Sequence, residues 1–219
     1  MATRQVLADL GALYQRGSTQ DVAVESVGGV DAARRVQAGE AFDGVVLAAS
    51  AIDQLTQAGR IVAGSRVDLV KSGVAIAVRS GAAQPDVTSE EAVRRAVLAA
   101  RSLSYSTGPS GVHLAKVFER WGIMDAIESR IVQAPPGVPV GSLVARGEVE
   151  LGFQQLSELM NLSGIVVLGP LPPDIQVITT FAAGVAATST QRDAVRSLLQ
   201  FMASSSADAV KRRNGMEPA

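Results

Sequence analysis

The sequence contains no cysteine and a single histidine, His113. Without cysteine, disulfides, thiolate metal sites and cysteine nucleophiles are excluded, and one histidine excludes a histidine-rich metal centre within one chain. Aromatic side chains are also scarce, with five Phe, two Tyr and one Trp among 219 residues. We therefore expect an aliphatic core, no metal ion and no cofactor.

Strong charge and long hydrophobic runs are absent as well. The formal net charge of −1 argues against nucleic acid as a partner, because such partners require a basic surface. The one basic run, Lys211 to Arg213, is interpreted as a solvated helix end. No stretch approaches the roughly 20 apolar residues of a membrane span, so we expect no membrane insertion.

The N-terminal residues, Met-Ala-Thr-Arg-Gln-Val-Leu, contain no apolar signal core. The chain as written is therefore expected to be cytoplasmic. A signal sequence upstream would make it periplasmic instead.

Short apolar runs typical of strands alternate with helical patterns along the whole chain. The predicted strands are residues 22–26, 44–48, 74–78, 103–106, 130–133, 150–153, 165–168 and 175–185. The predicted helices are residues 4–16, 31–38, 51–58, 89–101, 111–121, 140–145 and 190–203. Such alternation is typical of crossover connections, so it predicts an α/β fold with mainly parallel sheets flanked by helices.

The two halves of the chain repeat one pattern at an offset of 108 residues. Residues 29–44 placed over residues 137–152 match at six of sixteen positions, including the Gly-Glu pair that follows a short helix in each copy. This repeat predicts two similar α/β lobes. In the second half a strand at residues 103–106 precedes the next helix, and its first-half counterpart would fall before residue 1. We therefore expect the first lobe to lack that strand.

A Gly- and Ser-rich loop joins the predicted strand at 103–106 to the helix that follows. It contains Ser106, Thr107, Gly108, Ser110 and Gly111. Glycines let a backbone approach a ligand closely, and a helix N-terminus offers free N–H groups to an anion. The ending of a Walker loop is absent. The alternative interpretation is a capped turn that binds nothing.

Other polar or small residues follow predicted strands or open predicted helices. They are Thr3, Ala49, Ser50, Gln154 and Gln155. Ligands of open α/β sheets bind at the carboxyl ends of strands, so together these positions predict ligand contacts. Taken singly, Thr3 and Ser50 could be helix caps and the two glutamines could be surface residues.

Two further residues are candidates with equally plain alternatives. His113, in the first turn of the helix after the loop, could contact a ligand or act as a base, or simply lie on the helix surface. Arg79, after the apolar run 74–78, could pair with a carboxylate, or be solvated. No catalytic triad, paired acidic motif or metal motif is present.

Three long segments carry a resemblance to a known family. Residues 27–50, 64–81 and 104–123 resemble molybdate-binding-like solute-binding proteins, of the type II periplasmic superfamily. The resemblance covers nearly the whole chain. It extends to a divergent branch that includes proteins similar to aconitate isomerase.

The resemblance implies two lobes joined by two crossover hinge strands, at residues 74–78 and within 175–185. Residues 1–77 with 184–219 would form the first lobe and residues 78–183 the second. A small anion, an organic acid or an oxyanion, would be held in a cleft between the lobes.

The main functional hypothesis is thus a non-enzymatic solute-binding protein that serves an ABC permease. True molybdate binders have a Tyr where Gln154 and Gln155 stand here, which argues against molybdate. The alternative is an enzyme on the same fold, an isomerase of a small unsaturated carboxylate, with His113 as the only histidine base. A third hypothesis is the sensing domain of a regulator, although no helix-turn-helix precedes it.

Overall fold

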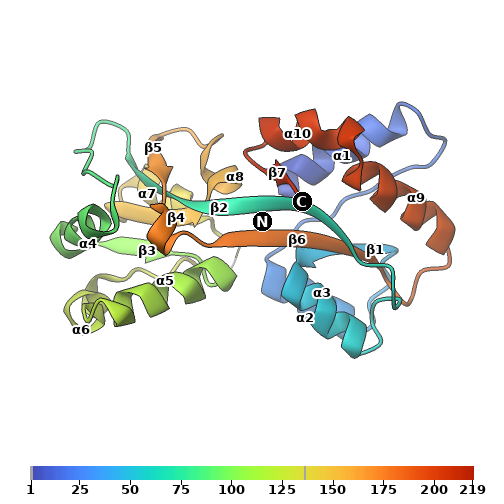
Figure 1. Cartoon of the computed structure of the whole chain (residues 1–219), viewed down its shortest axis with the longest axis horizontal. Helices are drawn as coiled ribbons and strands as arrows, with labels where there is room; N and C mark the ends of the chain where they lie inside the picture. The colour runs from blue at the N-terminus through green and yellow to red at the C-terminus, as the bar shows by residue number, and fades with distance from the viewer. Residues whose placement is uncertain (1, 136) are drawn as a thin grey trace. The chain divides into compact units, whose positions relative to one another are not determined.

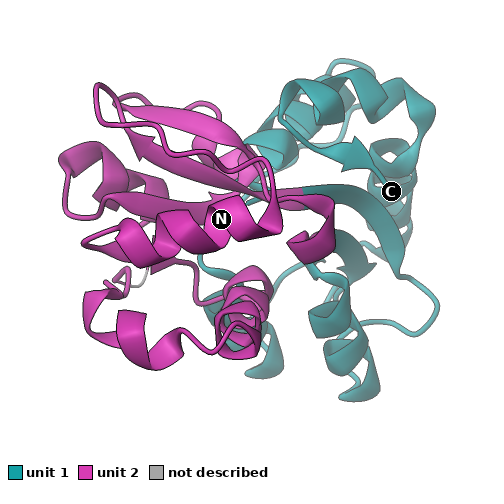
Figure 2. Cartoon of the chain, turned by 60° about the vertical axis from the view of Figure 1, so that its left-hand side comes forward, with its two compact units in different colours: residues 1–72, 179–219 teal, residues 73–178 magenta. Residues whose placement is uncertain are grey.

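The computed structural model describes residues 2–135 and 137–219 (Figure 1), so Met1 and Pro136 lie outside the described residues. The chain divides into two compact units (Figure 2). Unit 1 comprises Met1–Ser72 and Thr179–Ala219, and unit 2 comprises Gly73–Ile178. The boundaries predicted from the sequence, after residues 77 and 183, lie five residues C-terminal to the two boundaries between these units. The assignment of the units as lobes stays a prediction.

Unit 1 consists of both ends of the chain. Its elements are α1 (Arg4–Gln15), α2 (Gly29–Gln37), β1 (Gly44–Ala48), α3 (Ala49–Gln57), the first part of β2 (Val67–Arg79), β6 (Ile178–Val185), α9 (Arg192–Ala203), the 3-10 helix η3 (Ser205–Ala207), α10 (Asp208–Arg213) and β7 (Glu217–Pro218).

Unit 2 is formed by the middle of the chain. Its elements are the rest of β2, α4 (Glu90–Ala99), β3 (Leu103–Tyr105), α5 (Pro109–Arg120), α6 (Met124–Ile127), η1 (Glu128–Arg130), α7 (Val140–Arg146), β4 (Leu151–Gln155), α8 (Leu156–Leu159), β5 (Ile165–Pro170) and η2 (Pro173–Ile175).

The α/β class is confirmed, but the prediction of mainly parallel sheets is wrong. β1 pairs with β6 antiparallel, and β2 pairs antiparallel with β4, β5 and β7. Among the described strands, parallel pairing joins β3 to β4. Alternating helices and strands indicate crossovers but do not say which strands become neighbours. The later strands β4, β5 and β7 run along the long strand β2 in the opposite direction.

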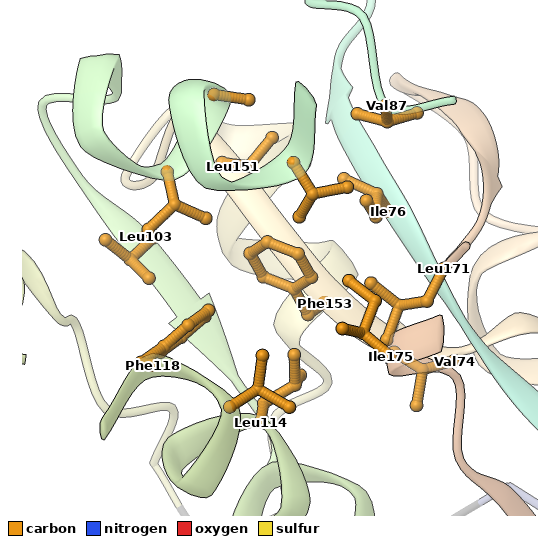
Figure 3. Packing of buried hydrophobic residues seen from close by; sticks show 14 of the residues in the cluster. Val74, Ile76, Val87, Leu103, Leu114, Phe118, Leu151, Phe153, Leu171 and Ile175 are labelled. Carbon is orange, nitrogen blue, oxygen red and sulfur yellow. The ribbon is translucent and has the colours of Figure 1, made fainter. Parts of the chain in front are cut away.

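Unit 2 buries both faces of β2. Val74, Ile76 and Val78 point into the large cluster shown in Figure 3, whereas Ala75 and Ala77 face a smaller one. Since successive side chains of a strand point to opposite faces, burial on both sides explains the uninterrupted apolar run in the sequence.

The large cluster of unit 2 centres on Phe153, which lies between Phe118 and Ile76 in Figure 3. The rings of Phe118 and Phe153 meet edge to face with centroids 6.0 Å apart. This packing holds α5 against the sheet, and it fixes where the loop before α5 lies.

Unit 1 has a cluster on each face of the β1–β6 pair. Ala183 and Val185 of β6 pack with α1, α9 and α10, and Ala182 packs with α2, α3 and β1. The other edge of β1, where the repeat would place a counterpart of β3, has no strand beside it within residues 2–135 and 137–219.

The repeated segments have the same local structure. α2 ends before Gly39 (φ 83°) and α7 ends at Gly147 (φ 75°), and a strand follows each of these glycines. Left-handed φ at both positions is accessible to glycine at little cost, which accounts for the repeated Gly-Glu pair.

Two predicted strands are wrong. Residues 22–26 form no strand, because the alternating apolar side chains pack on a helix instead: Val22 lies 3.4 Å from the position a Cβ would take on Gly11 of α1. Of residues 130–133, Arg130 ends η1 and Ile131 makes only an isolated bridge to Leu103.

The basic run at the C-terminal end of α10 also departs from expectation. Lys211 is only 1% exposed, with its Nζ 3.4 Å from Oδ1 of Asp208. Arg212 and Arg213 are exposed, so the prediction of a solvated helix end holds for them and is wrong for Lys211. In the described part of the chain, no helix is long and apolar enough to cross a membrane.

Candidate functional site

The loop between β3 and α5 presents two paired hydroxyl groups. Oγ of Ser106 and Oγ of Ser110 lie 2.9 Å apart. Gly108 occupies the N-cap of α5 and Pro109 its first turn, where the missing N–H of proline costs nothing. Ser110 is buried, so the paired hydroxyls are held in one place rather than moving with solvent.

Gly111 is required by the fold of this loop. A Cβ added there would lie 1.5 Å from the carbonyl oxygen of Ser106. The sequence predicts that glycines here admit a ligand. At Gly111, the atom that comes close is the backbone of the loop itself.

Two glutamines end the neighbouring strand β4, and both are buried. Oε1 of Gln154 accepts a hydrogen bond of 3.0 Å from the backbone N–H of Gly141 in α7. Its Nε2 donates a hydrogen bond of 2.7 Å to Oε2 of Glu158 in α8. Gln154 therefore links a helix start to a carboxylate.

Glu158 is a site residue that sequence reasoning missed. Burial raises the pKa of its carboxyl above the usual 4.5, while the positive charge of the N-terminal amine and the hydrogen bond from Gln154 each oppose part of that rise. Glu158 follows Gln154 by four residues, but α8 has only four residues and leaves no helical periodicity in the sequence. The available signal was a carboxylate shortly after two glutamines at a strand end.

The loop with the paired serines, residues 106–111 and from here on the serine loop, lies at the same edge of unit 2 as the glutamine pair. β3 and β4 are parallel, with Tyr105 opposite Phe153, so the residues that follow each strand emerge at one end of the sheet. Thr107 lies in the same loop as Ser106. Along the described chain, two buried side-chain atoms have no hydrogen-bond partner, Oγ of Ser104 in β3 and Oγ of Ser157 in α8.

His113 contacts the backbone of η2, within the same unit. Its Nε2 lies 3.1 Å from the carbonyl oxygen of Ile175. A carbonyl oxygen only accepts, so Nε2 donates and a neutral ring keeps its lone pair on Nδ1.

Arg79 lies at the opposite edge of unit 2. It ends β2 opposite Ile165, whereas Gln155 pairs with Val74 further back along the same strand. Its guanidinium Nη1 lies 3.0 Å from the position of an added Cβ on Gly147. The structure therefore does not bring Arg79 together with the serine loop and the glutamines.

The remaining predicted residues belong to unit 1. Thr3 is the N-cap residue of α1 but makes no side-chain capping bond. α3 begins at Ala49 with Ala48 as its N-cap, so Ser50 is an exposed first-turn residue and the alternative interpretation of it as a cap is wrong. No group of three or more metal-ligating side chains occurs among the described residues.

Comparisons with known proteins agree on the fold. The chain matches the model of the bacterial extracellular solute-binding protein family over residues 1–217. It is similar to the periplasmic molybdate-binding protein of Azotobacter vinelandii, with a TM-score of 0.80 and 18% identity over 98% of this chain and 95% of that one. It is also similar to AgtB of A. tumefaciens R10 in complex with agropinic acid, with a TM-score of 0.74 and 10% identity over 100% and 80% of the two chains.

A curated relative is more similar in sequence. An aconitate isomerase from Pseudomonas sp. is 37% identical to this chain over 185 residues, which is 84% of this chain and 70% of that protein. The expected molybdate-binding-like fold and the expected relationship to aconitate-isomerase-like proteins are both confirmed.

Proposed function

Since the chain belongs to the bacterial extracellular solute-binding protein family, we propose that it binds a small unsaturated carboxylate and isomerises it by an allylic proton shift. The observation that supports this most strongly is the similarity to an aconitate isomerase over most of both chains. Membership of the family implies a small ligand, and the relative favours turnover of that ligand. Fold alone does not choose between binding and turnover.

An allylic isomerisation moves one proton and transfers no electrons to or from another molecule. A base takes a proton from the CH₂ group beside the double bond, and the electrons of that C–H bond become a new C=C bond. The electron pair of the old double bond then takes up a proton at the far carbon. The protein must supply a base and donors that stabilise the intermediate negative charge.

Neutral donors of unit 2 suit the carboxylates of such a substrate. The hydroxyls of Ser106 and Ser110 and the partial positive charge at the start of the twelve-residue helix α5 favour an anion without a cationic side chain. Gln155 is a further ligand contact from the end of β4. In unit 1, Thr3, Ala49 and Ser50 are the residues to test for a second set of contacts.

The direct test is conversion of cis-aconitate by the full chain, followed by ¹H NMR. We expect the vinyl signal of trans-aconitate to appear. Replacing Ser110 with Ala should raise KM, because one hydroxyl donor is lost. Replacing the exposed Ser129 with Ala is the matched control and should leave KM and kcat unchanged. Binding of aconitate without any conversion would contradict the isomerase.

A second candidate function is binding without turnover, which the family match favours. It includes the predicted partnership with an ABC permease. A thermal-shift series of oxyanions, dicarboxylates and tricarboxylates tests it, since a ligand at 100 times its Kd stabilises the folded state by about 2.7 kcal/mol. A ligand that binds and is recovered unchanged would favour this second function.

A further inference from the structure

The side chain of Gln154 can adopt only one orientation. The backbone N–H of Gly141 only donates, so it must face the carbonyl oxygen of the amide, and the NH₂ group is then directed at Glu158. Gln154 is 4% exposed, so bulk water does not compete for these bonds. The hydrogen bond from Gln154 therefore stabilises the charged carboxylate of Glu158 and fixes the position of its Oε2.

In the described part of unit 2, the elements packed around Glu158 offer no cation that pairs with its carboxylate; the one positive charge that lowers its pKa is that of the N-terminal amine. β4 and β5, which pack on α8, carry no ionisable side chain. α7 carries Arg146, which pairs with Glu148 instead. Leu156 and Leu159, which flank Glu158 in α8, belong to an apolar cluster. A carboxylate without a salt-bridge partner in such surroundings keeps its basicity.

Glu158 is also not fully enclosed. Leu159 beside it is fully buried, whereas Glu158 is half-buried and keeps some exposed surface. It follows β4 at the edge where the serine loop follows β3. A base and anion-stabilising donors thus lie at one end of the same pair of parallel strands.

Resting on the proposed function, we propose that Glu158 is the catalytic base of the isomerisation and that Gln154 is its positioning residue. Oε1 of Glu158 takes the proton from the CH₂ group of the substrate, and the electrons of that bond enter the conjugated system. The resulting allylic carbanion is delocalised onto a carboxylate held by the serine loop. Glu158 then returns the proton to the other end of the allyl unit, so the atoms balance and nothing is oxidised.

The test compares Glu158→Gln with the wild type in D₂O, using cis-aconitate and ¹H NMR. The substitution keeps size and hydrogen bonding but removes the base. We expect turnover and exchange of the substrate C–H protons for deuterium to fall roughly 10²–10⁴-fold, with the Kd for aconitate changed less than about threefold. Glu128→Gln, which removes an exposed carboxylate of unit 2, is the matched control and should leave all three unchanged.

The pH profile supplies an independent readout. The kcat/KM of the wild type should rise with pH as Glu158 loses its proton, and this rise should be absent from the residual activity of Glu158→Gln. If the Gln variant does not fold, Glu158→Asp takes its place. The turnover of Glu158→Asp should be at least about tenfold slower than that of the wild type, because the shorter side chain moves the carboxylate away from the substrate. Its kcat/KM should still rise with pH.

The outcomes separate the two proposals. A wild-type chain that neither converts nor exchanges aconitate overturns the isomerase and the role of Glu158 together. An active wild type with Glu158→Gln, or Glu158→Asp in its place, retaining full turnover overturns Glu158 alone. Loss of turnover with intact binding supports both.

Discussion

Nε2 of His113 lies 3.1 Å from the carbonyl oxygen of Ile175. The two residues are 62 positions apart, and this hydrogen bond ties α5 to η2 within unit 2. A ring nitrogen that already donates to a carbonyl has a structural role, and only Nδ1 is left for chemistry.

His113→Gln should therefore retain turnover within about tenfold of the wild type, because a glutamine amide can still donate to Ile175. A catalytic base at this position would instead lose about 10²–10⁴-fold. Steady-state kinetics with aconitate decide between the two, with Glu158→Gln measured beside it. A loss in the larger range would make His113 the base, as the sequence-based alternative had it.

Gly111→Ala should destroy the serine loop, since the added methyl group would lie 1.5 Å from the backbone oxygen of Ser106. We expect little folded protein, or a strongly lowered Tm together with loss of binding. Gly108→Ala is the matched control in the same loop, because its Cβ would come no closer than 3.8 Å to another group. A Gly111→Ala variant as stable as Gly108→Ala would contradict the geometry of the loop.

Local patterns predict much of this fold. The strand at Gly44–Ala48 has the predicted bounds, and the repeated Gly-Glu motif marks the glycines that adopt left-handed φ after α2 and α7. Such features depend on neighbours in sequence. The pairing of β2 with β4 and β5 depends on residues 75 to 95 positions away, and no local pattern distinguishes it from a parallel arrangement.

The site was predicted in part for the same reason. Strand ends identify the serine loop and Gln154, since polar residues after apolar runs are visible in sequence. The role of Glu158 could not be predicted, because it depends on the orientation of the Gln154 amide. That orientation is set by the hydrogen bond from Gly141, which tertiary packing creates. Arg79 looks equivalent to Gln154 in sequence because it also follows a strand, but β2 and β4 are antiparallel and their ends lie at opposite edges.

Glu90 and Trp121, the only tryptophan, should report acid titration. The indole N–H of Trp121 donates to Oε1 of Glu90 at 2.6 Å, and this bond lowers the pKa of Glu90, with Arg120 adding to the effect. A lowered folded-state pKa stabilises the fold above the unfolded value of about 4.5, and that stability disappears as the pH falls through the folded pKa. Trp121 fluorescence should change in that acidic range, and Glu90→Gln should abolish the change. If the fluorescence of Glu90→Gln changed with pH as it does in the wild type, Glu90 would not be the group that titrates beside Trp121.

Gln154→Leu should move the pH profile of turnover without abolishing it. The amide of Gln154 donates to the charged carboxylate of Glu158, so its loss raises the pKa of Glu158 further and shifts the rise of kcat/KM to higher pH. A residue with a purely structural role would lower Tm and leave the profile where it was. The control is Gln133→Leu, outside this network. An unshifted profile in a folded Gln154→Leu variant would remove Gln154 from the positioning role and leave Glu158 to be judged alone.

The raised pKa of Glu158 also sets the sign of a stability effect. The folded state favours the protonated carboxyl, so Glu158 contributes stability that is fully present below its unfolded pKa and lost as the pH rises through its higher folded pKa. Glu158→Gln remains neutral and cannot lose that contribution. The free energy of unfolding of Glu158→Gln relative to the wild type should therefore increase as the pH rises through this window and level off above it. Urea unfolding at a series of pH values measures the difference, and Glu128→Gln should show none. A difference that decreased with rising pH would mean that the folded protein favours the charged carboxylate, and the effect of burial on the pKa of Glu158 would then be smaller than that of the N-terminal amine and Gln154 together.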